Sequence, residues 1–355
     1  MHARYPLLLL VLAVALIAGC DSDGLSEDDP VQTARAVYIA NQGNFGDANG
    51  SVSVYDPEAG TVSQAALTSF NSILQSLTLD DGRLYVAANT GGRVDVFATS
   101  DLTQSAQLAG LTGPRYMAVR GDKAFVTDQP PFGSARPSQV RVIDRSGAAP
   151  NVADSIAVSG TVDGIAVAGD RVYAALGAFG SSTRVAAINA AQNTLAEEIN
   201  VGCAARYLAA DRQDEVFVLC TDAAEAVVLD GATGTERARI ALPDTAETLF
   251  RIGQPAYYAA PAQELYVTTD SGIIRLDTEA NLVTAVLEAS TDPAPTAIAY
   301  DAGRESLYLG RTPAPPAGFT QRGSVTVHNR QGTPVDTFEV GVAPAYIDLQ
   351  PPATP

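Results

Sequence analysis

A short aromatic strand returns seven times along this chain. Each copy consists of an apolar residue, then Tyr or Phe, then a second short apolar run, and the aromatic positions lie 40 to 49 residues apart. A repeat of this length, built from short β-branched strands and polar turns, is typical of a propeller blade rather than of a helical solenoid. The period therefore predicts an all-β fold with seven blades. The aromatic residues are Tyr38, Tyr85, Phe125, Tyr173, Phe217, Tyr266 and Tyr308.

A second, alternating segment follows each aromatic strand, as in Ser51 to Asp56 and Gln139 to Asp144. Alternation with a period of two is the pattern of a half-buried strand. Six of the seven segments end in Asp or Asn, and Ala98 is the exception. Such side chains accept hydrogen bonds from the backbone of the turn that follows, so we expect them to cap turns. A ring of functional carboxylates is the alternative.

The ends of the chain predict how the ring closes. Six of the aromatic strands are preceded by a segment suited to be the innermost strand of a blade, but the chain enters the first blade directly at Val37. The missing strand is present at the C-terminus, where Pro344 to Leu349 matches the pattern of Pro114 to Val119. We therefore expect a seven-bladed β-propeller of four-stranded antiparallel blades over residues 36–349. The C-terminal strand would serve as the inner strand of blade one and remove an exposed edge.

The first nineteen residues have the features of a signal peptide. Arg4 precedes an apolar run from Leu7 to Ala18, which is too short to span a membrane. The run ends in Leu16-Ile17-Ala18-Gly19-Cys20, which resembles the bacterial lipobox. The resemblance implies that residues 1–19 are removed and that Cys20 is acylated with palmitate-type chains. The protein would then be exported and held on a membrane by its lipid anchor.

Residues 20–35 are acidic, lack apolar periodicity and are expected to form a disordered tether, as are residues 350–355 at the other end. The acidic residues after Cys20 look like the surface-export signal of Bacteroidota lipoproteins, which implies the outer membrane and the cell surface. In enteric bacteria, Asp21 would instead resemble an inner-membrane retention signal. A plain solvated linker, with the protein on the periplasmic face, is the other alternative.

The charge balance limits the partners. The chain has a formal net charge of −18, and its one lysine is Lys123. This argues against nucleic acid and anionic membrane surfaces as partners, and it suits a protein that stays soluble at high salt.

Two cysteines remain after Cys20, and in an exported protein we expect Cys203 and Cys220 to form a disulfide. A loop of that size would be stabilised by roughly 3 kcal/mol.

Catalytic motifs are scarce. One histidine, His328, follows the signal segment, and it is expected to be a partly exposed strand residue. The sequence has no HExxH motif, no P-loop and no GxSxG elbow. We therefore expect no catalytic residue, no metal site and no cofactor. A calcium site built from carboxylates of several blades remains open, with its possible ligands near strand ends at Asp128, Asp163, Asp222 and Asp270.

Three long turns between the second and third strands, and a shorter fourth one, carry a Phe beside or near a Gly, at Phe45, Phe132, Phe319 and Phe179 respectively. In antiparallel blades, these turns share a face with the connections that enter the inner strands. Arg115–Tyr116 and Arg206–Tyr207 lie at matching positions in two such connections, and Arg251 lies in the longest one. An aromatic rim around cationic groups suits a large, partly flat ligand. These nine residues are the predicted ligand-binding set; the alternative is that each Phe packs its own loop against the blade.

The opening segment Val37 to Gly46, continued by Ser51 to Gly60, resembles the first blade of a group of bacterial lipoprotein propellers. The group includes the cobalamin-capturing surface lipoproteins of Bacteroidota, and residues 36–349 more broadly resemble YVTN-type propellers. The resemblance implies a non-enzymatic protein that captures a small-molecule ligand, cobalamin foremost, for a TonB-dependent outer-membrane transporter. It transfers no ligand-contacting motif. The alternatives are a metal-dependent, lactonase-like hydrolase and a protein-binding scaffold at the cell envelope.

Overall fold

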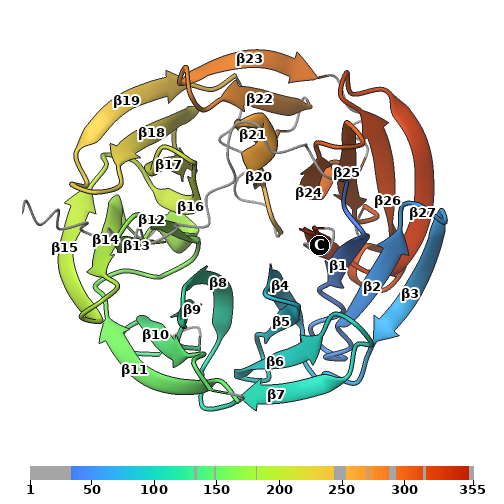
Figure 1. The fold of residues 1–355 in the computed structure, drawn as a ribbon, viewed down its shortest axis with the longest axis horizontal. Helices are drawn as coiled ribbons and strands as arrows, with labels where there is room; N and C mark the ends of the chain where they lie inside the picture. Colours follow the sequence, from blue (N-terminus) through green and yellow to red (C-terminus); the bar gives the residue numbers. More distant parts are fainter. Residues whose placement is uncertain are drawn as a thin grey trace, which may run out of the picture. The chain divides into compact units, whose positions relative to one another are not determined.

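Seven four-stranded antiparallel sheets surround a central axis in the computed structural model (Figure 1). The structure describes residues 33–131, 134–147, 149–180, 182–243, 253–269, 272–287, 293–314 and 317–351. The expected signal peptide, Cys20 and most of the expected tether lie outside these residues. The predicted all-β, seven-bladed propeller is confirmed. Among the described residues, no helix has the length and apolar character that a membrane crossing requires.

Blades one to four contain sixteen of the strands. From the innermost strand outward they are β28 (Pro344–Gln350), β1 (Ala36–Asn41), β2 (Ser51–Asp56) and β3 (Thr61–Leu67); β4 (Leu74–Asp80), β5 (Arg83–Ala88), β6 (Arg93–Ala98) and β7 (Gln104–Leu108); β8 (Pro114–Arg120), β9 (Lys123–Asp128), β10 (Gln139–Asp144) and β11 (Asn151–Ala157); and β12 (Ile165–Ala168), β13 (Arg171–Ala175), β14 (Arg184–Asn189) and β15 (Thr194–Asn200).

Blades five to seven follow the same order from the axis outward. Their strands are β16 (Ala205–Ala210), β17 (Glu215–Cys220), β18 (Glu225–Asp230) and β19 (Glu236–Ala241); β20 (Ala256–Ala259), β21 (Glu264–Thr268), β22 (Ile273–Asp277) and β23 (Leu282–Leu287); and β24 (Pro295–Asp301), β25 (Ser306–Arg311), β26 (Arg322–Asn329) and β27 (Pro334–Val342). Short 3-10 turns occur at η1 (Ala178–Gly180), η3 (Ala260–Ala262) and η4 (Ala317–Phe319).

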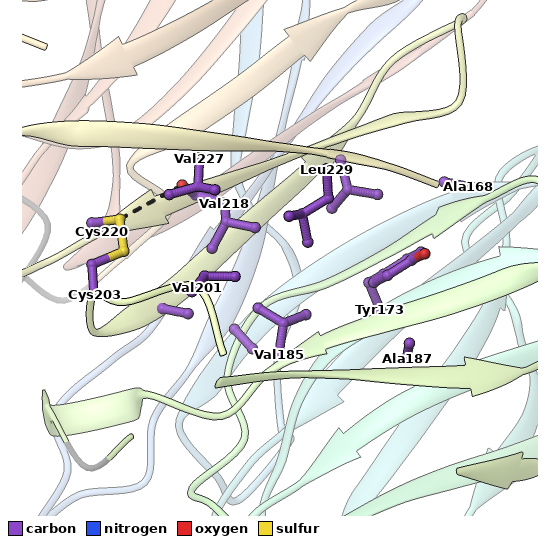
Figure 2. Close-up of a cluster of buried hydrophobic side chains, with 13 residues drawn as sticks. Ala168, Tyr173, Val185, Ala187, Val201, Cys203, Val218, Cys220, Val227 and Leu229 are labelled. Carbon is purple, nitrogen blue, oxygen red and sulfur yellow. Dashed lines mark hydrogen bonds between the residues drawn. A yellow bond between two sulfur atoms is a disulfide. The ribbon is translucent and has the colours of Figure 1, made fainter. Parts of the chain in front are cut away.

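The hydrophobic core lies between neighbouring blades. All seven repeated aromatic side chains are at most 2 % exposed. Figure 2 shows one such cluster, in which Tyr173 and Val185 of blade four face Val218, Val227 and Leu229 of blade five. The outermost strands form the circumference (Figure 1), and several alternate between exposed and partly buried residues. Burial on both faces explains why the aromatic strand is the most regular part of the repeat.

The polar residues that end the third strands cap turns, as predicted. Asp56 Oδ1 accepts hydrogen bonds from the backbone N–H groups of Glu58 and Ala59, each at 2.9 Å. The same arrangement recurs at Asp144, Asn189, Asp230, Asp277 and Asn329. In blade two, which has Ala98 at this position, Asp101 caps the turn by accepting from the Thr103 N–H at 3.0 Å. The hydrogen bonds to the backbone of the following turn therefore explain why Asp or Asn recurs at this position in six of the seven blades.

The C-terminal strand closes the ring as expected. β28 pairs antiparallel with β1, with Ile347 opposite Ile39. The pairing extends on both sides, because the Arg35 N–H donates to the Gln350 carbonyl at 2.8 Å and the Gln42 N–H donates to Ala343 at 2.7 Å. Blade one is thus built from both ends of the described chain, and its sheet has the same four strands as the others.

Two further predictions about single residues have different outcomes. The disulfide between Cys203 and Cys220 is present, with a Cα–Cα distance of 5.6 Å, and it lies at one end of the cluster in Figure 2. The expectation for His328 is wrong, because its side chain is buried, at 1 % exposure. Its Nδ1 lies 2.8 Å from the Gly332 carbonyl oxygen and its Nε2 lies 3.0 Å from Thr326 Oγ1. Burial lowers the pKa of His328, so the ring is neutral at pH 7.

Candidate functional site

One face of the ring carries both the turns between second and third strands and the connections into the inner strands. Strand direction alternates within each blade, so the turns between second and third strands and the connections into the inner strands lie on the same side of the ring. We call this side the long-loop face; among its described parts are residues 42–50, 134–138 and 176–180 and the starts of β8 and β16. The turns at Asp81 and Gln213 lie on the opposite face.

Three of the four predicted phenylalanines lie within the described residues, and all three are exposed. Phe45 is 72 % exposed, Phe179 is 65 % exposed and Phe319 is 39 % exposed. These fractions show that Phe45 and Phe179 are not buried by their own loops. Phe45 and Phe319 belong to the neighbouring blades one and seven, whereas Phe179 belongs to blade four. Phe132 and Arg251 lie outside the described residues.

At the starts of the inner strands, a buried polar cluster joins blades two, three, four and five. Asp163 Oδ1 accepts from Arg115 Nε at 3.1 Å and from Arg115 Nη2 at 3.0 Å. Its Oδ2 accepts from Arg206 Nε at 2.8 Å. Arg115 Nη1 also donates to Gln75 Oε1 at 2.8 Å. We call Gln75, Arg115, Asp163 and Arg206 the entrance cluster.

The electrostatics of the entrance cluster keep both arginines charged. Burial disfavours the charged form of Arg115, but Asp163, Tyr116 and Tyr207 together outweigh this effect, so the pKa of Arg115 is raised above its usual value. The pKa of Arg206 is raised in the same way, against the effect of burial, by Tyr207 and Asp163. Asp163 is fully buried, so the ion pairs that it forms are poorly screened by solvent.

The two tyrosines that follow these arginines in the sequence act as hydrogen-bond donors. The hydroxyl groups of Tyr116 and Tyr207 each donate to the Gly253 carbonyl oxygen at 3.3 Å. Burial, followed by the Asp163 charge, raises the pKa of Tyr116 to about 12. Burial likewise raises the pKa of Tyr207 well above its usual value. Both phenols are therefore neutral at physiological pH and donate to the backbone at Gly253.

Gly253 and Gln254 are hydrogen-bonded to the inner strands of several blades beside this cluster. The Gln254 N–H donates to the carbonyls of Thr296 at 3.0 Å and Ala345 at 2.8 Å, and Gln254 Oε1 accepts from the Ile347 N–H at 2.9 Å. Gly253 has a φ of +121°, and a Cβ there would lie 1.8 Å from the Thr296 carbonyl oxygen. Only glycine fits this position. The sequence reasoning missed both residues, although they lie in the longest connection, where an unusual path is to be expected.

Phe179 is placed against the entrance cluster by an unusual backbone conformation. Its φ and ψ are 57° and 28°, in the left-handed region that a bulky residue rarely adopts. The centre of the Arg206 guanidinium lies 5.8 Å from the Phe179 ring and 4.9 Å from the Tyr207 ring, so both rings are within cation–π distance. The Gly177 N–H donates to the Ala205 carbonyl at 2.8 Å and fixes the Phe179 turn beside the start of β16.

The carboxylates that left a calcium site open have structural partners where they are described. Asp128 accepts from the N–H groups of Thr112 and Gly113 at 2.8 and 2.7 Å. Asp222 accepts from the Ala204 N–H at 2.7 Å, and Asp163 holds the two arginines. Asp270 lies outside the described residues. Within the described part of the chain, one group of three potential metal ligands lies close together, Cys203, Cys220 and Glu225, and its two sulfur atoms are bonded to each other.

The solved structures that resemble this chain share its propeller fold. The periplasmic gluconolactonase of Pseudomonas aeruginosa is 16 % identical, with a TM-score of 0.65 over 89 % of this chain and 100 % of that one. Apo AztD from Citrobacter koseri is 15 % identical, with a TM-score of 0.57 over 89 % and 97 %. A functionally unknown protein from Desulfotomaculum acetoxidans is 11 % identical, with a TM-score of 0.69 over 90 % and 100 %. At these identities, the likeness shows the fold alone.

No protein with a curated description matches the sequence. A family model does match, over residues 35–308, from the first strand of blade one to the aromatic strand of blade seven. Because the match spans most of the chain, this seven-bladed propeller belongs to the family described as a domain of unknown function, DUF5074.

Proposed function

We propose that the protein is a non-enzymatic cell-envelope lipoprotein that captures a small-molecule ligand on its long-loop face. The exposure of Phe45 and Phe179, at 72 % and 65 %, carries the proposal. Large apolar side chains held in water on loops of one face are typical of a surface that a ligand covers. The strained backbone of Phe179 adds support, because strain of this kind is concentrated at binding sites.

Cobalamin is the ligand that we propose by name. The resemblance of Val37 to Gly46 to the cobalamin-capturing lipoproteins supports it, and so does the chemistry of a corrinoid. A corrinoid combines a broad ring with amide and phosphate groups, which suit a face that carries both exposed aromatic side chains and a cluster of polar side chains. A TonB-dependent transporter would receive the ligand. The lipid on Cys20 would hold the protein on the outer membrane, facing the cell surface.

The test is a titration of cyanocobalamin into the full-length protein in detergent, followed by calorimetry. Replacing both Phe45→Ala and Phe319→Ala should weaken binding about a hundredfold, since each buried ring contributes on the order of 1–3 kcal/mol. Asp81→Ala and Gln213→Ala, on the opposite face, are the controls and should bind as wild type does. Loss of binding in the controls and not in the Phe variants would place the site on the other face.

A metal-dependent, lactonase-like hydrolase is the second proposal. The shared fold with the gluconolactonase of Pseudomonas aeruginosa favours it. Incubation with gluconolactone and Ca²⁺ or Zn²⁺, with and without EDTA, tests it directly. Turnover that EDTA abolishes would establish an enzyme and overturn the capture proposal. Saturable cyanocobalamin binding without lactone turnover would support capture, and binding of neither small molecule would favour the protein-binding scaffold.

A further inference from the structure

We infer that β23, the outer strand of blade six, is the surface through which two copies of this chain pair edge to edge. The two strands would run antiparallel about a two-fold axis at Thr284, and two four-stranded blades would become one eight-stranded sheet. The inference goes beyond the proposed function. It uses the circumference of the ring rather than the long-loop face, and it requires neither the ligand nor the lipid.

The first argument is the open edge of β23. β22 pairs with one side of the strand, and no other strand in the described part of the chain pairs with its other side. Figure 1 shows β23 in orange on the circumference of the ring. The backbone groups on such an edge can form hydrogen bonds to an added strand. All seven outer strands have an open edge, so the side chains must decide between them.

The second argument is the lack of charge on β23. Charged side chains on an edge strand oppose pairing with another chain. Four of the other outer strands, β11, β15, β19 and β27, carry such residues, namely Asp154, Glu197, Glu198, Glu236, Arg237, Arg239, Asp336 and Glu339. β23 reads Leu-Val-Thr-Ala-Val-Leu and carries none. A β-bulge against the third strand occurs in all seven blades, so it does not distinguish β23.

The third argument is the apolar surface that β23 exposes. β3 and β7 are also uncharged, but their exposed residues are small or polar: Thr61, Ser63, Ala65, Gln104, Ser105 and Gln107. On β23, Leu282 is 47 % exposed and Val286 is 48 % exposed, and the exposed Thr284 lies between them. An open, uncharged edge with exposed apolar side chains is suited to a further strand.

The pattern of these side chains indicates that the further strand is a second β23. In an antiparallel pair centred on Thr284, Leu282 of each copy lies opposite Val286 of the other. Residues directly opposite each other in an antiparallel pair contact on the same face of the sheet. The two-fold axis repeats the Leu–Val contact, so both exposed apolar side chains of both copies are covered, and Thr284 meets its own equivalent on the axis.

The charge of the molecule supports the same partner. Two copies with a net charge of −18 repel each other over most of their surfaces, and an uncharged strand is where they can approach. Salt should therefore strengthen this pairing, whereas it would weaken the binding of a basic partner. One pair of strands buries less than the roughly 800 Å² per partner of a standard interface, so we expect a weak dimer that forms at high concentration.

The experiment is sedimentation equilibrium of the full-length protein in density-matched detergent, at about 1 to 200 µM protein. We expect a monomer–dimer equilibrium whose Kd is lower in about 0.5 M NaCl than in about 0.05 M NaCl. Val286→Lys should raise the Kd at least about tenfold, because the charge would lie opposite Leu282. Val335→Lys on β27 is the matched control, since Val335 is 63 % exposed, and it should leave the dimer intact. Both lysines reduce the net negative charge, so a loss in one variant alone is a local effect.

A mixing experiment tests the register. Leu282→Glu should also weaken the dimer, but an equal mixture of Leu282→Glu and Val286→Lys should restore it. In the mixed dimer, the new glutamate lies opposite the new lysine, and the second Leu–Val contact is unchanged. Failure of the mixture to associate would overturn the antiparallel pairing about Thr284.

Thr284→Cys gives a covalent readout that does not depend on Val286→Lys being folded. Opposed residues of an antiparallel pair have Cα atoms about 4.5–5.5 Å apart, within the range of a disulfide. Oxidation should yield a covalent dimer on a non-reducing gel, whereas wild type and Thr337→Cys on β27 should not. A monomer at every concentration without this cross-link would overturn the inference. A dimer that Val286→Lys leaves intact, or one that salt weakens, would overturn it as well.

Discussion

At the scale of single residues, Phe179 combines two unfavourable features, an exposed aromatic ring and a left-handed backbone. Glycine adopts this conformation without strain, whereas alanine does not. We therefore expect Phe179→Gly to be more stable than Phe179→Ala by about 1 kcal/mol, measured by urea unfolding. Both variants should lose ligand binding. Phe45 is the control, because its φ is not among the positive values, so Phe45→Gly should be no more stable than Phe45→Ala.

Asp348 is a half-buried carboxylate on β28, the strand that closes the ring, and it should make stability depend on pH. Burial raises its pKa from 3.8 to about 7, although Oδ2 accepts from the Leu79 N–H and Oδ1 accepts from the Leu349 N–H. The folded protein holds this proton more tightly than the unfolded chain, so stability falls as the pH rises from about 4 to about 7, by about 1.4 kcal/mol for each unit of pKa difference. Tyr257 and Tyr346, the titratable groups beside it, stay neutral in this range because burial raises both of their pKa values.

Asp348→Asn should remove this dependence. The variant gains stability relative to wild type as the pH rises between 4 and 7, and the gain stays constant above about 7. Asparagine keeps one carbonyl oxygen for the Leu79 N–H, so the lost second acceptor shifts the stability equally at every pH. Thermal melts at several pH values measure the slope. Parallel curves for the two proteins would show that Asp348 is ionised in the folded state.

At the scale of elements, the sequence predicted the blades because each strand has a local pattern, either an aromatic triplet or an alternation. The turn-capping residues were predictable for the same reason, since Asp56 and its equivalents bond to backbone only two or three residues away. The contacts of Gly253 and Gln254 were not predictable, because their partners Tyr116, Tyr207, Thr296 and Ala345 come from four different blades. His328 was misjudged because strand periodicity does not reveal how its side chain packs in the folded blade, where it is buried.

The C-terminal strand β28 gives the clearest prediction at this scale. Deleting Val342 to Pro355 removes β28, leaves the edge of β1 unpaired and takes away the Ala345 and Ile347 groups that hold Gln254. Thermal unfolding should begin well below the wild-type temperature. Deleting only Pro351 to Pro355, beyond the strand, is the control and should leave the melting curve unchanged. An unaltered curve for the longer deletion would mean that β28 does not close the ring.

At the scale of the whole molecule, acidic residues outnumber basic ones by 40 to 22. Self-repulsion of this kind destabilises a compact state, and salt screens it. The Debye length falls from about 30 Å at 0.01 M to about 3 Å at 1 M, so screening acts on most of the surface. Exposed ion pairs such as Arg184–Glu198 are screened as well, but each contributes only about 0–1 kcal/mol.

We therefore expect the melting temperature to rise with NaCl between 0.01 and about 0.5 M, where screening changes most. KCl at equal concentration is the control and should give the same rise, because screening depends on ionic strength rather than on the identity of the cation. Neutralising several exposed carboxylates on the opposite face, including Asp81, Asp122 and Asp214, should raise the melting temperature at low salt and flatten its salt dependence. A melting temperature that falls with salt would show instead that the arginine ion pairs outweigh the repulsion.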